Sequence, residues 1–179
     1  ILCYFIFFKK RKLFTQTLLG VTILVIFVCI DSFYQFLNYT PENGFGEDLL
    51  GFKSNWYGRL TGPFGDELIP GSYISKFGLL GFAFLISIKK FENKIIFHSI
   101  YLSSILFISF ISGERMAFAT FGLGLVFLFI FLSGFRKSIF LSIIIGIFFI
   151  FLATNLHPSY NDFKVVESTQ YHQGQKIEK

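Results

Sequence analysis

An arginine in a glycine- and proline-rich segment is the residue most suited to chemistry in this sequence. The stretch from Tyr57 to Lys76 surrounds Arg59 with Gly58, Gly62, Pro63, Gly65, Pro70 and Gly71. Glycine and proline at this density fix turns and allow the backbone to approach a ligand closely. The guanidinium group is a permanent cation, and its planar fork of donors suits phosphate or carboxylate. The segment therefore predicts a shaped loop that binds an anion through Arg59.

A second charged place lies between two apolar runs that almost no loop separates. Its sequence is Ser-Gly-Glu-Arg-Met-Ala over residues 112–117. Charged side chains at such a depth cost a few kcal/mol when unpaired, so Glu114 and Arg115 must face water, each other or a polar cavity. Both are therefore candidates for function. Two structural alternatives stay open: a local ion pair between them, and an arginine that extends to the water interface.

The remaining residues with catalytic or ligating potential lack the spacing that such chemistry needs. The sequence has no P-loop, HExxH, Gly-x-Ser-x-Gly or Cys/His zinc pattern, so we expect no metal and no cofactor. Cys3 and Cys29 lie within apolar runs and are interpreted as small buried hydrophobic residues. His98 lies within one turn of a predicted helix end. It is interpreted as an interfacial or packed histidine, with a proton relay as the alternative.

The composition places these candidates in an integral membrane protein. Of 179 residues, 53% are hydrophobic, 21% are aromatic and only 15% are charged, with a mean hydropathy of +0.62. This is too apolar for a soluble domain of this size. The formal charge of +5 does not indicate a nucleic-acid partner, because the basic residues cluster at the ends of apolar runs. Positive charge at these positions orients helices in a bilayer.

Five apolar runs predict an all-α fold, a polytopic transmembrane helical bundle. A bilayer core requires about 20 helical residues. We place the complete spans at about 13–32, 71–88, 95–112, 116–133 and 138–154. Residues 1–8 form an apolar stub too short to cross, and we expect the chain to begin inside a helix as one partial N-terminal span. The predicted transmembrane region covers residues 1–156, with one outer-face loop at 33–72 and a polar outer-face tail at 157–179.

The distribution of charge orients the predicted bundle. Nine of the 16 Lys and Arg residues lie in the turns at 9–12, 89–94 and 136–137, which alternation of the spans brings to one side. An excess of Lys and Arg marks the cytoplasmic side of a membrane protein. The loop at 33–72 is net acidic and is therefore expected outside.

This orientation brings Arg59, Glu114 and Arg115 to the outer face. Asp31, at the end of the first span, is expected at the same interface and in contact with solvent. Two arginines from separate segments beside a glycine-rich loop would form a clamp for a lipid-borne pyrophosphate or another anionic head group.

These motifs resemble the O-antigen ligase and O-antigen polymerase family of bacterial envelope proteins. The resemblance rests on Arg-Leu-Thr-Gly-Pro-Phe-Gly at residues 59–65, followed by a span and then by Ser-Gly-Glu-Arg-Met-Ala at the outer start of another. The family's pattern is an Arg-x-x-Gly-x-Phe loop and a later Ser-Arg-like helix start. This sequence differs by inserting Glu114 before Arg115. The resemblance covers about residues 13–154.

The resemblance implies glycan transfer at the periplasmic face of the bacterial inner membrane, as in lipopolysaccharide biosynthesis. It implies an undecaprenyl-pyrophosphate-linked glycan donor, a glycan or lipid A-core acceptor, contact with membrane lipid, and no metal or cofactor. Arg59 and Arg115 would be catalytic and would stabilise the leaving phosphate. Gly62, Phe64 and Glu114 would bind the substrate.

The choice between ligase and polymerase stays open. Ligases of the family place a base histidine in a later outer loop, in a His-Asn context. His157-Pro and His172-Gln do not match it, so we expect that position beyond Lys179.

Two other classes remain as alternatives, a lipid-linked sugar transporter or flippase and a non-catalytic membrane scaffold. A transporter would have charged or broken helices near the midplane, and no complete predicted span has a charged residue at its centre. A scaffold would not require the arginine loop.

Overall fold

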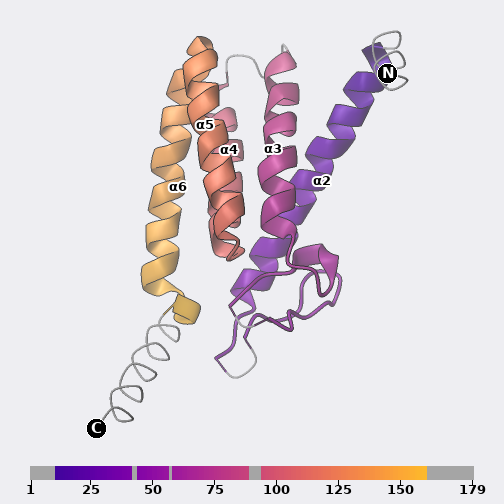
Figure 1. The fold of residues 1–179 in the computed structure, drawn as a ribbon, viewed down its shortest axis with the longest axis vertical. Coiled ribbons are helices and arrows are strands. Elements are labelled where there is room, and N and C mark those ends of the chain that lie inside the picture. The colour runs from indigo at the N-terminus through magenta and orange to yellow at the C-terminus, as the bar shows by residue number, and fades with distance from the viewer. Residues whose placement is uncertain (1–10, 42–43, 57, 89–93, 161–179) are drawn as a thin grey trace.

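The computed structural model describes residues 11–41, 44–56, 58–88 and 94–160, and these form an all-helical bundle (Figure 1). Neighbouring helices along the chain run in opposite directions, and two short 3₁₀ helices, η1 and η2, lie in the connections. The elements are α2 (Arg11–Leu37), η1 (Gly62–Phe64), α3 (Pro70–Ser87), α4 (Ile95–Ile111), α5 (Arg115–Phe131), η2 (Ser133–Phe135) and α6 (Arg136–Leu156). The predicted all-α class is confirmed for the described residues.

Each of the five predicted spans coincides with one of these helices. Several predictions fall outside the described residues. They concern the N-terminal stub with Cys3, part of the basic turns, and the tail beyond Tyr160 with His172.

Two helices have the length and composition needed to cross a membrane. The segment Leu13–Leu37 has 25 residues and Ser133–Leu156 has 24, and the most apolar 18-residue windows within them have mean hydropathies of 2.4 and 2.6. At about 1.5 Å per residue, both exceed a hydrocarbon core of about 30 Å. Only 17% and 22% of their apolar windows are buried, so most of their surface faces outward. The apolar helices α4 and α5 are shorter, at 17 residues each.

The helix α2 extends five residues beyond the end of the predicted span, into the segment predicted to begin the outer loop. The reason is a buried face that continues past the apolar run and includes polar side chains. Its members recur every three or four residues: Thr22, Val25, Val28, Asp31, Ser32, Gln35 and Phe36. This helical spacing is preserved although hydropathy falls, because the loop between α2 and α3 packs against this face.

Small residues on α3, Gly78 and Gly81, allow α3 and α4 to approach closely. A Cβ atom at Gly78 would lie 2.6 Å from Ile105 Cδ1, and one at Gly81 would collide with the hydroxyl of Tyr101. That hydroxyl donates a hydrogen bond to the Gly78 carbonyl oxygen at 3.1 Å. The helix contact therefore depends on the absence of side chains at both positions.

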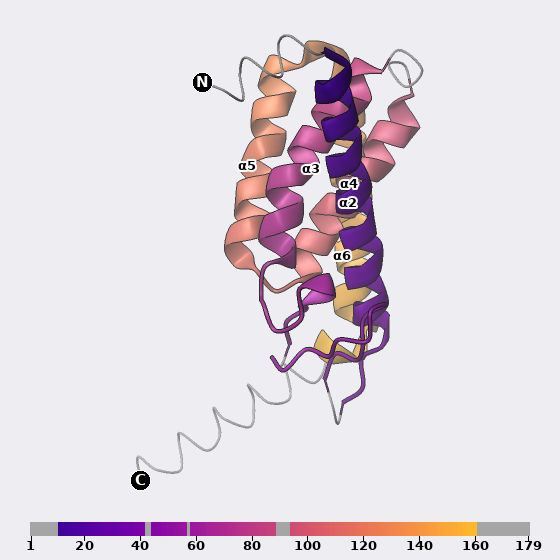
Figure 2. The same ribbon diagram turned by 90° about the vertical axis from the view of Figure 1, so that its right-hand side faces the viewer.

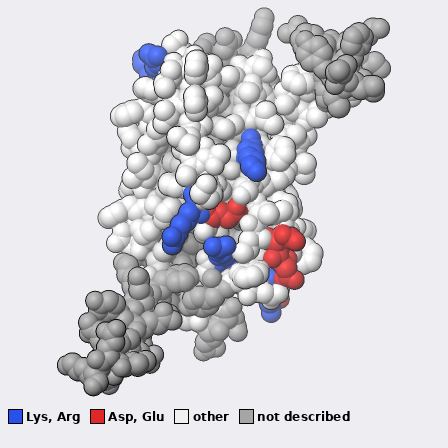
Figure 3. Space-filling model, in the orientation of Figure 1, with Lys and Arg blue, Asp and Glu red and all other residues white. Residues whose placement is uncertain are grey.

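The loop between α2 and α3, the α4–α5 turn and the end of α6 lie at one end of the bundle (Figures 1 and 2). The α5–α6 connection, with the basic residues Arg136 and Lys137, lies at the opposite end. Charged side chains gather toward the loop end of the face shown in Figure 3, and most of the remaining surface there is uncharged. Arg59, Glu114 and Arg115 thus share one end of the molecule, as predicted.

Candidate anion-binding site

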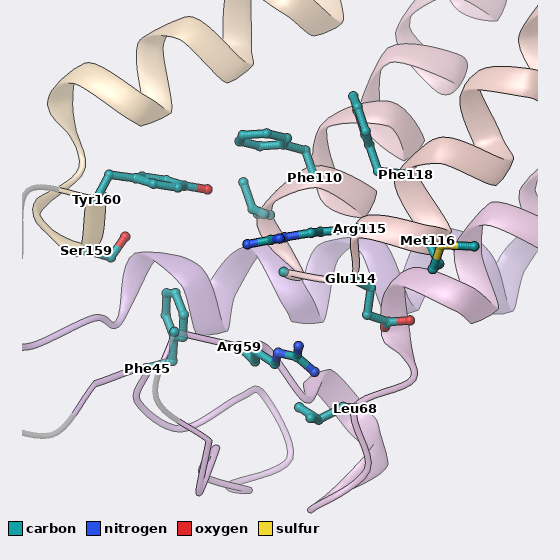
Figure 4. Close-up of a pocket in the computed structure, with 13 residues that line it drawn as sticks. Phe45, Arg59, Leu68, Phe110, Glu114, Arg115, Met116, Phe118, Ser159 and Tyr160 are labelled. Carbon is teal, nitrogen blue, oxygen red and sulfur yellow. The ribbon is translucent and has the colours of Figure 1, made fainter. Parts of the chain in front are cut away.

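A cavity of about 1010 Å³ lies at the loop end of the bundle (Figure 4). Its lining includes Arg59 from the glycine-rich loop, Glu114 and Arg115 from the start of α5, and Ser159 and Tyr160 from the segment after α6. Aromatic side chains from the loop, α4 and α5 complete the walls. Three segments that are distant in sequence therefore enclose one space, whose size is typical of a ligand pocket.

The two arginines carry the positive charge of this cavity. Both side chains are exposed, and neither guanidinium group makes a hydrogen bond or ion pair with any described residue. Figure 4 shows Arg115 reaching across the cavity toward Tyr160, while Arg59 approaches from the loop. Each planar fork of donors therefore remains available to an anionic ligand.

Glu114 has partners other than those the sequence suggests. Its Oε1 accepts a hydrogen bond from the Gly71 backbone N–H at 2.8 Å, and its Oε2 accepts from the Ser72 N–H at 3.1 Å and from the Ser72 hydroxyl. These donors belong to the first turn of α3, whose N–H groups have no partner within the helix. The predicted alternative of an ion pair with Arg115 is wrong. Glu114 lines the cavity, as its predicted substrate-binding role requires, and these hydrogen bonds also give it a positioning role between α3 and α5.

Gly113 joins the arginine loop to the α4–α5 turn. Its φ of 79° lies in the left-handed region that favours glycine. A Cβ atom there would lie 3.2 Å from both the Gly58 carbonyl oxygen and Arg59 Cγ. The sequence pattern predicts no role for Gly113. The sequence feature that could have identified Gly113 is its position directly before the charged pair, in a turn with almost no loop.

Gly62 and Phe64 do not line the cavity, in contrast to their predicted role in substrate binding. The Gly62 N–H donates to Gln35 Oε1 at 2.9 Å, and its Cα faces Ser32 on α2. The Phe64 ring packs against Tyr73, with 5.4 Å between centroids. Both residues instead hold the loop against α2 and α3, because they lie on the side of the loop that faces these helices. These contacts agree with the prediction that the loop has a fixed shape.

His157 is packed rather than free. Its ring stacks on Phe36 with 3.9 Å between centroids, Nδ1 lies 2.7 Å from Ser159 Oγ, and Nε2 lies 3.0 Å from the Phe36 carbonyl oxygen. Burial lowers the pKa of His157, and the hydrogen bond to the Phe36 carbonyl opposes that shift. Burial also raises the pKa of Tyr160 to about 12. The interpretation of His98 as a packed histidine is confirmed by its buried position among aromatic rings.

The function of this site is therefore inferred from its geometry alone. No family model, curated protein or solved structure matches the chain. Within the part of the chain that the structure describes, no group of three or more His, Cys, Asp or Glu side chains could hold a metal ion. The feature from which a function can be argued is therefore the pair of arginines in one cavity, neither of which has a partner among the described residues.

Proposed function

We propose that this chain binds the pyrophosphate of an undecaprenyl-linked glycan donor, as part of a ligase or polymerase similar to the O-antigen ligase and O-antigen polymerase family. One observation carries the proposal: Arg59 and Arg115, both without a partner among the described residues, line one cavity at the end of an apolar helical bundle. Two guanidinium forks can bind several phosphate oxygens at once. The acceptor would be a second glycan or a lipid A-core.

In the proposed reaction, the bond between the sugar C1 and the pyrophosphate oxygen breaks while an acceptor hydroxyl bonds to C1. Negative charge develops on the leaving phosphate, and Arg59 and Arg115 stabilise it. A base must also remove the acceptor's proton. His157 does not suit this role, because both of its ring nitrogens already have partners.

The proposal places the bundle across the inner membrane with its loop end in the periplasm. The exposed apolar surfaces of α2 and α6 support a membrane setting. Basic residues at the opposite end, among them Arg136 and Lys137, suit the cytoplasmic side. The helices α4 and α5, each about 25 Å long at 1.5 Å per residue, would cross with local thinning of the bilayer or with extension of flanking polar side chains.

The test replaces each arginine in the gene that encodes this chain and measures polymer or O-chain length on gels, with membrane abundance checked by blotting. Arg59→Lys and Arg115→Lys keep the charge but lose the fork, so each should reduce product on the order of 10²-fold, nearly as much as alanine. Arg136→Lys, at the far end of the bundle, is the matched control and should retain activity. Full activity in either of the first two variants would refute the clamp.

A further inference from the structure

Three buried oxygen atoms near the loop end of α2 have no hydrogen-bond partner among the described residues. They are Asp31 Oδ2, Ser32 Oγ and Asp48 Oδ2. The three side chains are 0%, 0% and 4% exposed, respectively. The sequence predicts a solvated Asp31, and this is wrong, because the outer loop folds over this face of α2. A buried polar atom without a partner carries a desolvation cost, so something must offset that cost.

The side chains of Asp31 and Ser32 face one point, and the loop brings Asp48 to the same end of α2. The Leu49 backbone N–H donates to Asp31 Oδ1 at 2.9 Å, which brings the neighbouring Asp48 to α2. The two carboxylates are near enough to repel each other electrostatically. A Cβ atom built on Gly62 would lie 2.7 Å from Ser32 Oγ and 3.6 Å from Asp31 Oδ2, so both oxygens face the same point.

No basic side chain compensates these carboxylates within the described residues. The ion pair found in this loop joins Lys53 to Glu47 at 3.3 Å, and both side chains are exposed. Backbone N–H groups bind the other oxygen of each aspartate, and Asp48 Oδ1 accepts from residues 50 and 52 at 2.9 and 2.7 Å. A cation at this point would offset both the burial of the two carboxylates and the repulsion between them.

We propose that Asp31, Asp48 and Ser32 bind one hard divalent cation, with Ca²⁺ as the best fit. The ligands are all oxygens, two of them from carboxylates, and this set suits Ca²⁺ or Mg²⁺ rather than a softer metal. Ca²⁺ accepts irregular geometry and neutral oxygen ligands more readily than Mg²⁺ does. The bound ion would tie α2 to the 48–52 turn and to the Gly62 segment. The site is separate from the arginine cavity, whose lining contains none of these residues.

The test uses the purified chain in detergent, stripped with a chelator and titrated with Ca²⁺ by calorimetry, with Mg²⁺ as a competitor. Thermal unfolding is measured in parallel. We expect saturable binding and a rise in melting temperature with Ca²⁺. Asp31→Asn and Asp48→Asn should each weaken binding about tenfold or more. Glu47→Gln is the matched control, because it removes an exposed carboxylate from the same loop.

Ser32→Ala keeps both charges and tests the site independently if an asparagine variant does not fold. It should weaken binding by several fold, because it removes one ligand without changing the charge. Absence of saturable binding in the original chain would overturn the proposal, and so would equal binding in the Asp31 and Asp48 variants. If Asp31→Asn and Asp48→Asn are more stable than the original chain and no variant responds to Ca²⁺, the carboxyl groups are protonated. That result also overturns the proposal. Arginine-dependent polymer assembly is a separate readout, so failure here leaves the proposed function testable.

Discussion

Replacing Glu114 tests the contact that positions the start of α5 against α3. Glu114→Ala removes the carboxylate that accepts three hydrogen bonds. Their donors are the N–H groups of Gly71 and Ser72 and the Ser72 hydroxyl. Hydrogen bonds to a charged group contribute about 1.5–3 kcal/mol each. Glu114 is half-exposed and water can replace part of what is lost, so we expect a total loss of about 3 kcal/mol rather than the full sum. Glu114→Gln keeps one acceptor oxygen and should lose about 1–2 kcal/mol.

The assay is reversible unfolding in mixed detergent micelles, from which the free energy of unfolding is obtained for each variant. Glu67→Ala is the control, because this side chain is exposed just before α3 and makes no interaction with the described residues. It should change the free energy of unfolding by no more than about 0.5 kcal/mol. A double-mutant cycle between Glu114→Ala and Ser72→Ala should give a coupling energy of about 1 kcal/mol.

The same cycle between Glu114→Ala and Arg115→Ala should give a coupling energy near zero, because no ion pair joins the two side chains. Strong coupling to Arg115 would restore the ion-pair alternative. A Glu114→Ala variant within about 0.5 kcal/mol of the original chain would refute the assigned contact.

Three further predictions concern the loop, the histidine and the orientation. Gly62→Ala should lose about 2 kcal/mol or more, because φ is 51° and the new Cβ would lie 2.7 Å from a serine oxygen of α2. Gly65→Ala, with φ of 66° and open space, should lose only about 1 kcal/mol. Burial lowers the pKa of folded His157, so the unfolded chain binds the proton more readily. Stability should be retained above about pH 6.5 and fall as the pH drops below it, and His157→Gln should reduce that slope in unfolding measurements. In a cysteine-free background, a cysteine at Asn55 should react with an impermeant reagent from the outer side, whereas one at Lys137 should not; the reverse pattern would invert the proposed orientation.

The sequence by itself determined the helices and their order. Long apolar runs form helices because backbone groups in an apolar setting must pair internally, and this requirement acts locally along the chain. Because successive helices alternate in direction, Arg59 and Arg115 can be placed at the same end without knowing any tertiary contact. The boundaries of α3 to α6 agree with the predicted spans to within two residues for the same reason.

The tertiary structure alone decided what each side chain near the site contacts. Spacing marks Gly62 as part of a binding loop, but only packing against α2 shows that it faces inward. Glu114 stands beside Arg115 in sequence, yet the unpaired N–H groups of α3 bind its carboxylate. Asp31 lies at the end of an apolar run, as an interfacial acid would, and the loop covers it. These contacts join segments that are distant in the chain, so no local pattern of residue types encodes them.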